Sequence, residues 1–223
     1  MSQTHELAGD LLIIGAGGHG AVVLDIIQAA GIYRPIGFID ADPAQAGKMI
    51  GGVPVLGPLN LLPKLKRKPR FTIVAIGDNR ARVSYAAKLK QAGFELVNAI
   101  HPTAHVSPSA IVGCNLVMAA GAIVSASARI GDSVLINTGA IIDHECEIGD
   151  GAHLGPGSKL AGRVRVAAGA FVGIGACVIQ CLRIGEDAIV GAGAVVICDV
   201  ADRDTVIGVP ARSMHRPTLA RSA

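Results

Sequence analysis

Every sixth residue is aliphatic in the stretch GAIVSASARIGDSVLINTGAIIDHECEIGD, which runs from Gly121 to Asp150. Stepping by six from Val106 to Val196 meets an aliphatic residue or Met at all sixteen positions. Ala occupies nine of the fifteen positions that lie four residues further on. A helix repeats near ~3.6 residues and a strand near ~2, so a period of six indicates a short strand and a turn. Stacked coils of such units predict a parallel β-helix.

The composition agrees with a buried aliphatic ladder. The apolar fraction is 51% and mean hydropathy is +0.50, yet aromatic residues are only 3% and Trp is absent. The uncharged stretch 106–128 contains Pro108 and Gly113, which makes it a poor membrane-spanning helix, so we expect no membrane insertion. The net charge of +3 comes without basic runs interleaved with aromatics, which argues against nucleic-acid binding.

The cysteines and the N-terminus indicate the compartment. The five cysteines include no CxxC pair, and their number is odd, so we expect reduced and mostly buried thiols. The opening MSQTHELAGD lacks the basic-then-apolar order of a secretory leader. These features predict a cytoplasmic protein.

The first hundred residues carry a nucleotide-binding pattern. DLLIIGAGGHGAVVLDIIQAAG predicts a buried strand, a Gly15-x-Gly17-x-x-Gly20 turn and a helix that ends at Gly31. PIGFID predicts a second strand ending at Asp40, twenty residues after Gly20, which completes a dinucleotide-type fingerprint. FTIVAIGDN, RARVSYAAKLKQAG and FELVNAI predict a strand, a helix and a last strand.

The length of this region favours one nucleotide over a dinucleotide. NAD lies across two mononucleotide-binding halves, and about a hundred residues give room for one half. A glycine turn that serves only packing is the alternative. We therefore predict an α/β Rossmann-like half-domain at residues 1–99, a β-helix at 100–212 and a C-terminal tail at 213–223.

Six motifs in fixed order extend the interpretation: IIGAGGHG, GFID, IVAIGDN, IHPTAHVSPSA, NTGAIIDHECEIGDGAHLGPGSKLAG and GVPAR. In this order the chain resembles the hexapeptide-repeat acyltransferases that N-acetylate nucleotide-linked 4-amino sugars, of the UDP-bacillosamine and GDP-perosamine type. The resemblance implies a left-handed β-helix, acetyl-CoA as co-substrate, a homotrimer and a role in glycan or lipopolysaccharide biosynthesis. Asp78 follows Gly77 where bacillosamine-type sequences tend to have Asn, so the base and the sugar stay open.

His144 and Glu145 are the candidate catalytic pair. His144 lies two residues after inward-facing Ile142, so it faces outward. The resemblance implies that His144 is the general base and that Glu145 raises its basicity. An imidazole, whose ordinary pKa is about 6.5, can accept the proton that an amine loses during acyl transfer. A role in positioning an amine that binds already neutral is the alternative. Asn137 is implied to orient the reacting groups, or else it is a polar turn residue.

A metal site is not expected. His144 and His153 are nine residues apart, half of an eighteen-residue coil, so they cannot converge within one chain. Cys146 occupies the small inward position of its hexad. If both histidines serve one reaction, the site lies between subunits, with His144 from one chain and His153 from its neighbour.

The resemblance implies two further groups of site residues. The nucleotide-sugar site would use Gly17, Gly18, His19, Asp40, Ala41 and Gly77, and the acetyl-CoA site would use His153, Ile174 and Ala192. Two other functions are compatible with the same chain. One is O-acetylation of a sialic acid or another sugar hydroxyl, and the other is a non-catalytic scaffold that binds nucleotide sugars.

Overall fold

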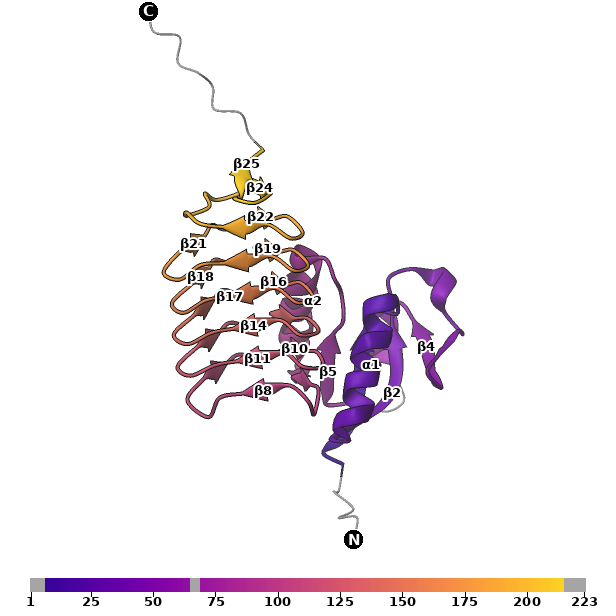
Figure 1. The fold of residues 1–223 in the computed structure, drawn as a ribbon. Helices are drawn as coiled ribbons and strands as arrows, with labels where there is room; N and C mark the ends of the chain where they lie inside the picture. Colours follow the sequence, from indigo (N-terminus) through magenta and orange to yellow (C-terminus); the bar gives the residue numbers. More distant parts are fainter. Residues whose placement is uncertain (1–6, 65–68, 215–223) are drawn as a thin grey trace, which may run out of the picture.

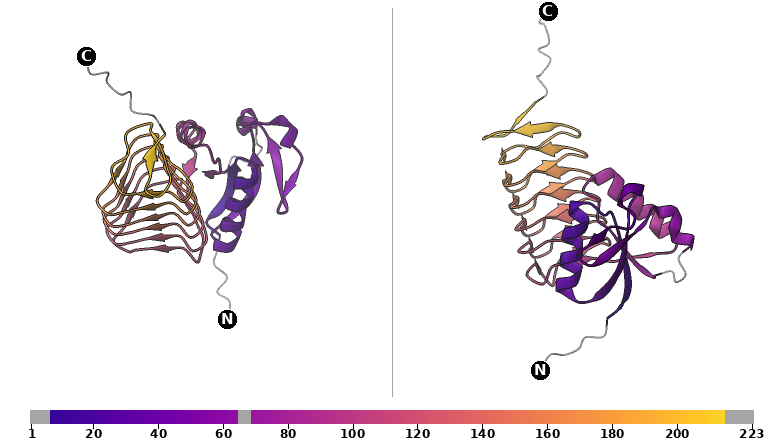
Figure 2. Two further views of the ribbon diagram at one scale, coloured as in Figure 1. Left: turned by 45° about the horizontal axis from the view of Figure 1, so that its top comes forward. Right: turned by 90° about the vertical axis from the view of Figure 1, so that its right-hand side faces the viewer.

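The computed structural model describes residues 7–64 and 69–214 of the chain. An α/β domain and a β-helix lie side by side, with helices α1 (Gly18–Ala30) and α2 (Asn79–Gln91) close to one flank of the β-helix (Figure 1; Figure 2). The predicted fold class is confirmed: a Rossmann-like half-domain precedes a left-handed parallel β-helix. Most of the predicted C-terminal tail, residues 215–223, lies outside the described residues.

The α/β domain has a six-stranded sheet of order β3-β4-β2-β1-β5-β6, in which β3 is antiparallel to β4 and the other pairs are parallel. Helix α1 ends at Gly31, whose φ of 64° lies in the left-handed region that ends many helices. The elements are β1 Gly9–Ile14, α1 Gly18–Ala30, β2 Tyr33–Ile39, η1 Pro43–Gln45, β3 Met49–Ile50, β4 Val53–Gly57, η2 Leu59–Lys64, β5 Phe71–Val74, α2 Asn79–Gln91 and β6 Glu95–Leu96.

Two features of this domain differ from the sequence prediction. The β3–β4 hairpin was not predicted. The single strand predicted for FELVNAI is wrong, because β6 joins the Rossmann-like sheet while β7, Ala99–Ile100, opens the β-helix. Asn98 between them pairs with the first coil: its Oδ1 accepts from Leu116 N at 2.9 Å, and its Nδ2 donates to Gly113 O at 2.9 Å. These bonds satisfy the coil's backbone at the point where the chain leaves the first sheet.

The β-helix has three faces, and up to β23 each is a parallel sheet whose neighbouring strands are eighteen residues apart, as Ile136 and Leu154 are. Face 1 contains β7, β10 Val117–Met118, β13 Leu135–Ile136, β16 His153–Leu154, β19 Phe171–Val172, β22 Ile189–Val190, β24 Thr205–Ile207 and antiparallel β25 Arg212–Ser213. Face 2 contains β8 His105–Val106, β11 Ile123–Val124, β14 Ile141–Ile142, β17 Lys159–Leu160, β20 Cys177–Val178 and β23 Val195–Val196. Face 3 contains β9 Ile111–Val112, β12 Arg129–Ile130, β15 Glu147–Ile148, β18 Arg165–Val166 and β21 Arg183–Ile184.

The aliphatic ladder predicted from the six-residue period fills the interior. Val124, Ile142 and Leu154 are each 0% exposed, and the small residues between them, including Cys146, are equally buried. Each strand points its other side chain outward, because successive side chains of a strand alternate between its two sides. The outward side chains therefore show what covers each face.

The three faces have different outward surfaces. On face 1, Val117 and Leu135 are at most 1% exposed because they pack against α1 of the α/β domain. Face 3 is charged and exposed, with Arg129, Glu147, Arg165 and Arg183 in one column. Face 2 carries an outward column that no other element of the described chain covers. Ile123, Ile141, Cys177 and Val195 in this column are half-buried, whereas His105 and Lys159 are exposed.

Candidate active site

The glycine-rich turn lies at the carboxyl end of β1, where the topology switches direction between β2 and β5. Gly15 has a φ of 108°, and a Cβ there would lie 2.6 Å from Ala75 O, so its glycine is required by the backbone. Gly20 approaches the carbonyl of Gly15 too closely for any side chain. A Cβ on Gly17 or Gly18, in contrast, would meet nothing within 4 Å. The space beside these two glycines at the N-terminus of α1 suits an anionic ligand.

Asp40 closes this turn from the end of β2. Its Oδ2 accepts from Ala16 N at 2.6 Å, and its Oδ1 accepts from Asp42 N at 2.9 Å. Each carboxylate oxygen keeps a second lone pair, so a ribose hydroxyl can still donate to it. Ala41 and Gly77 are exposed at the same carboxyl edge of the sheet, after β2 and β5. The structure therefore brings the six predicted nucleotide-sugar residues to one edge.

His19 and His153 connect this edge to the β-helix. His153 projects from β16 on face 1, where its ring meets the edge of Phe171 with ring centroids 4.9 Å apart. Burial, and after it the positive charge of nearby Arg82, together lower the pKa of each histidine from 6.5 to about 4. The Nε2 atoms of both rings are buried without a hydrogen-bond partner in the structure. Two neutral imidazoles thus offer open hydrogen-bonding positions where the two domains meet.

Arg82 joins the two domains, and nothing in the sequence distinguished it. It is 0% exposed on α2, and burial lowers its pKa to about 10, so it stays charged at neutral pH. Its guanidinium donates to Ile76 O at 2.9 Å in its own domain, and to Ser133 O at 2.8 Å and Gly151 O at 2.9 Å in the β-helix. Within the described residues the guanidinium donates to neutral carbonyl and amide oxygens, and the charge of nearby Asp78 offsets the effect of burial only in part. Arg82 therefore makes the neighbourhood electropositive.

A cavity of about 540 Å³ opens beside this cluster, between the start of α2 and face 1. Arg80 borders it and forms an ion pair with Asp187 of the β-helix at 2.8 Å. Asn79 donates to Gly169 O at 2.9 Å, which adds a further hydrogen bond between the domains. The cavity is lined by Gly77, Asp78, Asn79, Arg80, His153, Gly169, Phe171, Asp187 and Ile189.

His144 and Glu145 lie elsewhere, in the turn between β14 and β15, on the edge between faces 2 and 3. His144 Nδ1 is 3.0 Å from Glu145 Oε2, and both side chains are about half exposed. Asp143 accepts from His144 N at 2.7 Å through its Oδ1 and fixes the turn. If Nδ1 carries the proton and donates to the carboxylate, Nε2 is left as the proton acceptor. The pair therefore has the geometry of an oriented imidazole base.

Asn137, Ile174 and Ala192 lie on a different edge. Each follows a strand of face 1 and precedes a strand of face 2, so the three share the edge between these faces. Ile174 is 57% exposed, and Asn137 Oδ1 accepts from Thr138 N at 2.8 Å. Within one chain the structure thus places Asn137 with the predicted acetyl-CoA residues, and separates it from His144 and Glu145.

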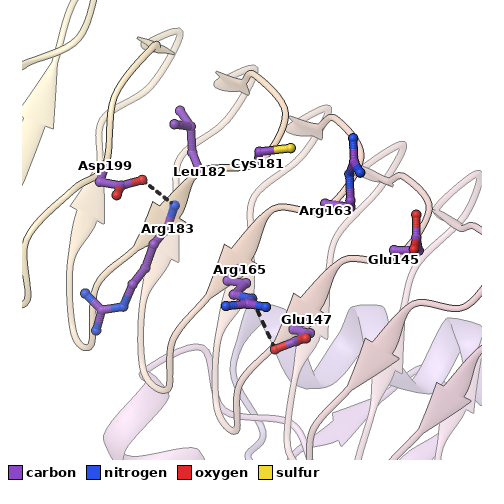
Figure 3. A pocket seen from close by; sticks show the side chains of 8 residues that line it. All are labelled: Glu145, Glu147, Arg163, Arg165, Cys181, Leu182, Arg183 and Asp199. Atoms are coloured by element: carbon purple, nitrogen blue, oxygen red, sulfur yellow. Dashed lines mark hydrogen bonds and ion pairs between the residues drawn. The ribbon is translucent and has the colours of Figure 1, made fainter.

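A groove of about 600 Å³ continues from Glu145 across face 3 (Figure 3). Two of its arginine side chains are engaged in ion pairs: Arg165 with Glu147 at 3.5 Å, and Arg183 with Asp202 at 2.7 Å. Arg163 lies one coil beyond Glu145 on the same edge. The groove is therefore lined by both signs of charge rather than by a continuous cationic surface.

Residues 7–64 and 69–214 contain no group of three or more His, Cys, Asp or Glu side chains placed to hold a metal ion. Neither α1 nor α2 is long and apolar enough to cross a membrane, and no other described helix is.

Comparisons with known protein families match both parts of the chain. Residues 10–89 match the family described as the PglD N-terminal domain, and residues 127–162 match the bacterial transferase hexapeptide family of six repeats. The chain is 39% identical over 115 residues to UDP-N-acetylbacillosamine N-acetyltransferase of Bacillus subtilis (strain 168). That alignment covers 50% of this chain and 51% of the relative, so it spans about half of the curated protein's length.

Solved structures match the chain over nearly its full length. GDP-perosamine N-acetyltransferase from Caulobacter crescentus, a histidine-to-alanine mutant in complex with CoA and GDP-perosamine, is 46% identical with a TM-score of 0.89. The match covers 94% of this chain and 98% of that one. The acetyltransferase domain of PglB from Neisseria gonorrhoeae FA1090, in complex with acetyl coenzyme A, is 39% identical with a TM-score of 0.85, covering 92% and 98%.

Proposed function

Because the chain belongs to the nucleotide-sugar N-acetyltransferases of the hexapeptide-repeat acyltransferase family, we propose that it transfers the acetyl group of acetyl-CoA to a sugar amine. The acceptor is the 4-amino group of a nucleotide-linked 4-amino-4,6-dideoxy sugar, and the product serves glycan or lipopolysaccharide biosynthesis. One observation of the structure carries this proposal. The chain combines an oriented His144–Glu145 pair on its β-helix with a glycine turn that leaves space for a nucleotide.

The reaction follows from the chemistry of the two substrates. The amine nitrogen attacks the thioester carbonyl, a C–N bond forms, and the C–S bond breaks to release the CoA thiolate. The attacking nitrogen must lose a proton, and His144 Nε2 accepts it while Nδ1–H remains bonded to Glu145. General-base catalysis of this kind contributes ~10²–10⁴-fold to the rate. The imidazolium that forms lies 3.0 Å from a carboxylate that stabilises it.

The nucleotide portion of the substrate binds at the α/β domain. Gly17, Gly18 and His19 receive the diphosphate at the N-terminus of α1, Asp40 and Ala41 receive the nucleoside, and Gly77 borders the opposite side. The charge of Arg82 favours an anion at this place. Acetyl-CoA lies along the edge that carries Asn137, Ile174 and Ala192, next to His153.

The protein acts as a homotrimer, and the uncovered column of face 2 supports this assembly. Ile123, Ile141 and Val195 lose their remaining exposure when three copies turn face 2 toward a common axis. In that arrangement the edge between faces 2 and 3 of one subunit meets the edge between faces 1 and 2 of the next. His144 of one copy then approaches the acetyl-CoA edge of its neighbour, which completes a site that one chain lacks.

The free thiols support a cytoplasmic location. All five cysteines are unpaired, and three of them, Cys146, Cys114 and Cys177, are buried or half-buried in the β-helix. Such use of cysteine is typical of reducing compartments.

The decisive experiment measures CoA thiol release from acetyl-CoA with a panel of acceptors. The panel contains GDP-, UDP- and dTDP-linked 4-amino-4,6-dideoxy sugars, the matching 4-hydroxy sugars and free sialic acid. We expect release with at least one amino sugar, and a product whose mass rises by one acetyl group. Thiol release only with hydroxyl acceptors would assign O-acetylation. If nucleotide sugars bind but no acceptor of the panel causes thiol release, the protein is a non-catalytic nucleotide-sugar scaffold.

A further inference from the structure

The ring of His144 lies directly against Gly162, the residue that occupies the same place one coil further on. A Cβ on Gly162 would be closest to His144 Nε2, and it would lie 2.6 Å from Cε1 and 3.1 Å from Cδ2. Real Cβ atoms do not approach other heavy atoms within 3.0 Å. The imidazole therefore occupies the volume that any side chain at position 162 would need.

The backbone itself does not require glycine here. Gly162 is absent from the residues with positive φ, and the left-handed residue of this turn is Arg163, with a φ of 59°. Residues at eighteen-residue spacing along the same edge carry side chains: Ala126 one coil before His144, and Gln180 one coil after Gly162. A side chain is thus compatible with this position of the coil, and the special feature of Gly162 is its neighbour.

Backbone hydrogen bonds fix the distance between the two residues. Arg163 N donates to His144 O at 2.9 Å, and Cys181 N donates to Gly162 O at 3.1 Å. Adjacent strands of a sheet lie about 4.8 Å apart, and these ladders hold the two coils at that spacing. The coils cannot separate to admit a methyl group, so the more mobile partner, the exposed imidazole, must move instead.

We propose that Gly162 is a positioning residue for the reaction, an inference that rests on the proposed acetyl transfer. Its bare Cα forms a flat support that holds the imidazole with Nδ1 at Glu145 and keeps Nε2 accessible to the amine. A methyl group at position 162 rotates the ring away from this support and breaks the 3.0 Å contact with Glu145. The ring is then neither held in one tautomer nor aimed at the substrate, although both substrate sites are intact.

The test is a double-mutant cycle of Gly162→Ala and His144→Ala. Gly162→Ala is expected to lower kcat at least tenfold, with KM for both substrates within twofold of wild type. In the His144→Ala background the same methyl group should change kcat by less than twofold, because the ring that it displaces is gone. The matched control, Ala126→Gly, alters one methyl group on the same edge and should retain wild-type kcat. Full activity of Gly162→Ala, or an equal loss in both backgrounds, would overturn the inference.

A readout without catalysis separates this inference from the proposed function. With ¹³C-labelled histidine, the ring resonance that His144→Ala removes should shift in Gly162→Ala, whether or not any acceptor is turned over. An unmoved resonance contradicts the inference even in an active enzyme, whereas a wild type inactive toward every acceptor contradicts only the proposed function. If Gly162→Ala alone fails to fold, recovery of folding in the double variant supports the clash with His144, and continued failure refutes it.

Discussion

Glu145 has a left-handed backbone, with a φ of 57°, and its carboxylate lies 3.0 Å from the ring of His144, its neighbour in the sequence. In an extended strand adjacent side chains point to opposite sides and cannot meet in this way. A left-handed residue costs a non-glycine side chain on the order of 1 kcal/mol or more, and such strain concentrates at functional sites. Glu145 shares this conformation with turn residues in other coils, including Ser127 and Arg163, so the repeat supplies the turn and the His–Glu sequence supplies its chemistry.

The first prediction concerns this pair. His144→Ala should lower kcat at least tenfold, because the amine then loses its proton acceptor. Glu145→Gln retains a hydrogen-bonding group but not its charge, so a smaller loss of kcat is expected. Steady-state kinetics with the best acceptor of the panel measure both, and circular dichroism verifies the fold. An unchanged kcat with a raised KM would make His144 a residue that only positions the amine.

Asp40 provides the second prediction. Asp40→Ala removes the acceptor of the 2.6 Å bond from Ala16 N, which holds the glycine turn, and a possible acceptor for the nucleoside. KM for the nucleotide sugar should rise at least tenfold, while the affinity for acetyl-CoA, measured by calorimetry, stays within twofold. Asp42→Ala is the matched control, because Asp42 lies on the same exposed segment but caps Ala44 N instead. Equal weakening of both substrates would indicate a general folding defect.

The third prediction is a loss of stability in mild acid. The folded protein holds His19 and His153 with pKa values of about 4, mainly through burial, whereas the ordinary pKa of histidine is 6.5. Between pH 6.5 and pH 4 the unfolded chain therefore binds more protons than the folded chain. The free energy of unfolding is therefore highest above pH 6.5. It decreases as the pH falls toward 4, by up to roughly 3 kcal/mol for each histidine.

Denaturant midpoints at fixed protein concentration, taken from pH 7.5 to pH 4.5, measure this effect. His153→Gln should reduce the pH dependence by about half, since one of two comparable groups is removed. Wild-type pH dependence in His153→Gln would show that other groups cause the acid sensitivity.

The sequence was sufficient for the β-helix because its period is enforced by packing. Each inward position must be aliphatic to fill the same interior. The six-residue spacing alone therefore predicts that Val124, Ile142 and Leu154 are buried. The bounds of α1 could be predicted equally well, because the glycine turn precedes its first residue and Gly31 follows its last.

Contacts between the domains could not be read in the same way. Arg82 lies in a helix with other basic residues, and only the structure shows that its guanidinium reaches Ser133 and Gly151, more than fifty residues away. Gly162 is one of 29 glycines, and its spacing from His144 is visible, but the direction of the imidazole is not. Such features depend on rotamers and on contacts distant in the sequence, which leave no periodic pattern.

The last prediction tests whether the site lies between subunits. His144 lies on the edge between faces 2 and 3, whereas His153 projects from face 1, and the buried aliphatic ladder separates them within one chain. If both serve one reaction, as proposed, each cleft takes His144 from one copy and His153 from the next. His144→Ala and His153→Ala are prepared separately, and each should be strongly impaired.

The two variants are then unfolded, mixed in equal amounts and refolded. Around any mixed trimer exactly one of the three clefts receives both intact histidines, and three quarters of randomly formed trimers are mixed, so about one quarter of the wild-type activity should return. Each parent refolded alone serves as the control and should stay impaired. Native mass spectrometry establishes that mixed trimers have formed. Mixed trimers as inactive as their parents would place both histidines in a single chain's site and exclude the shared cleft.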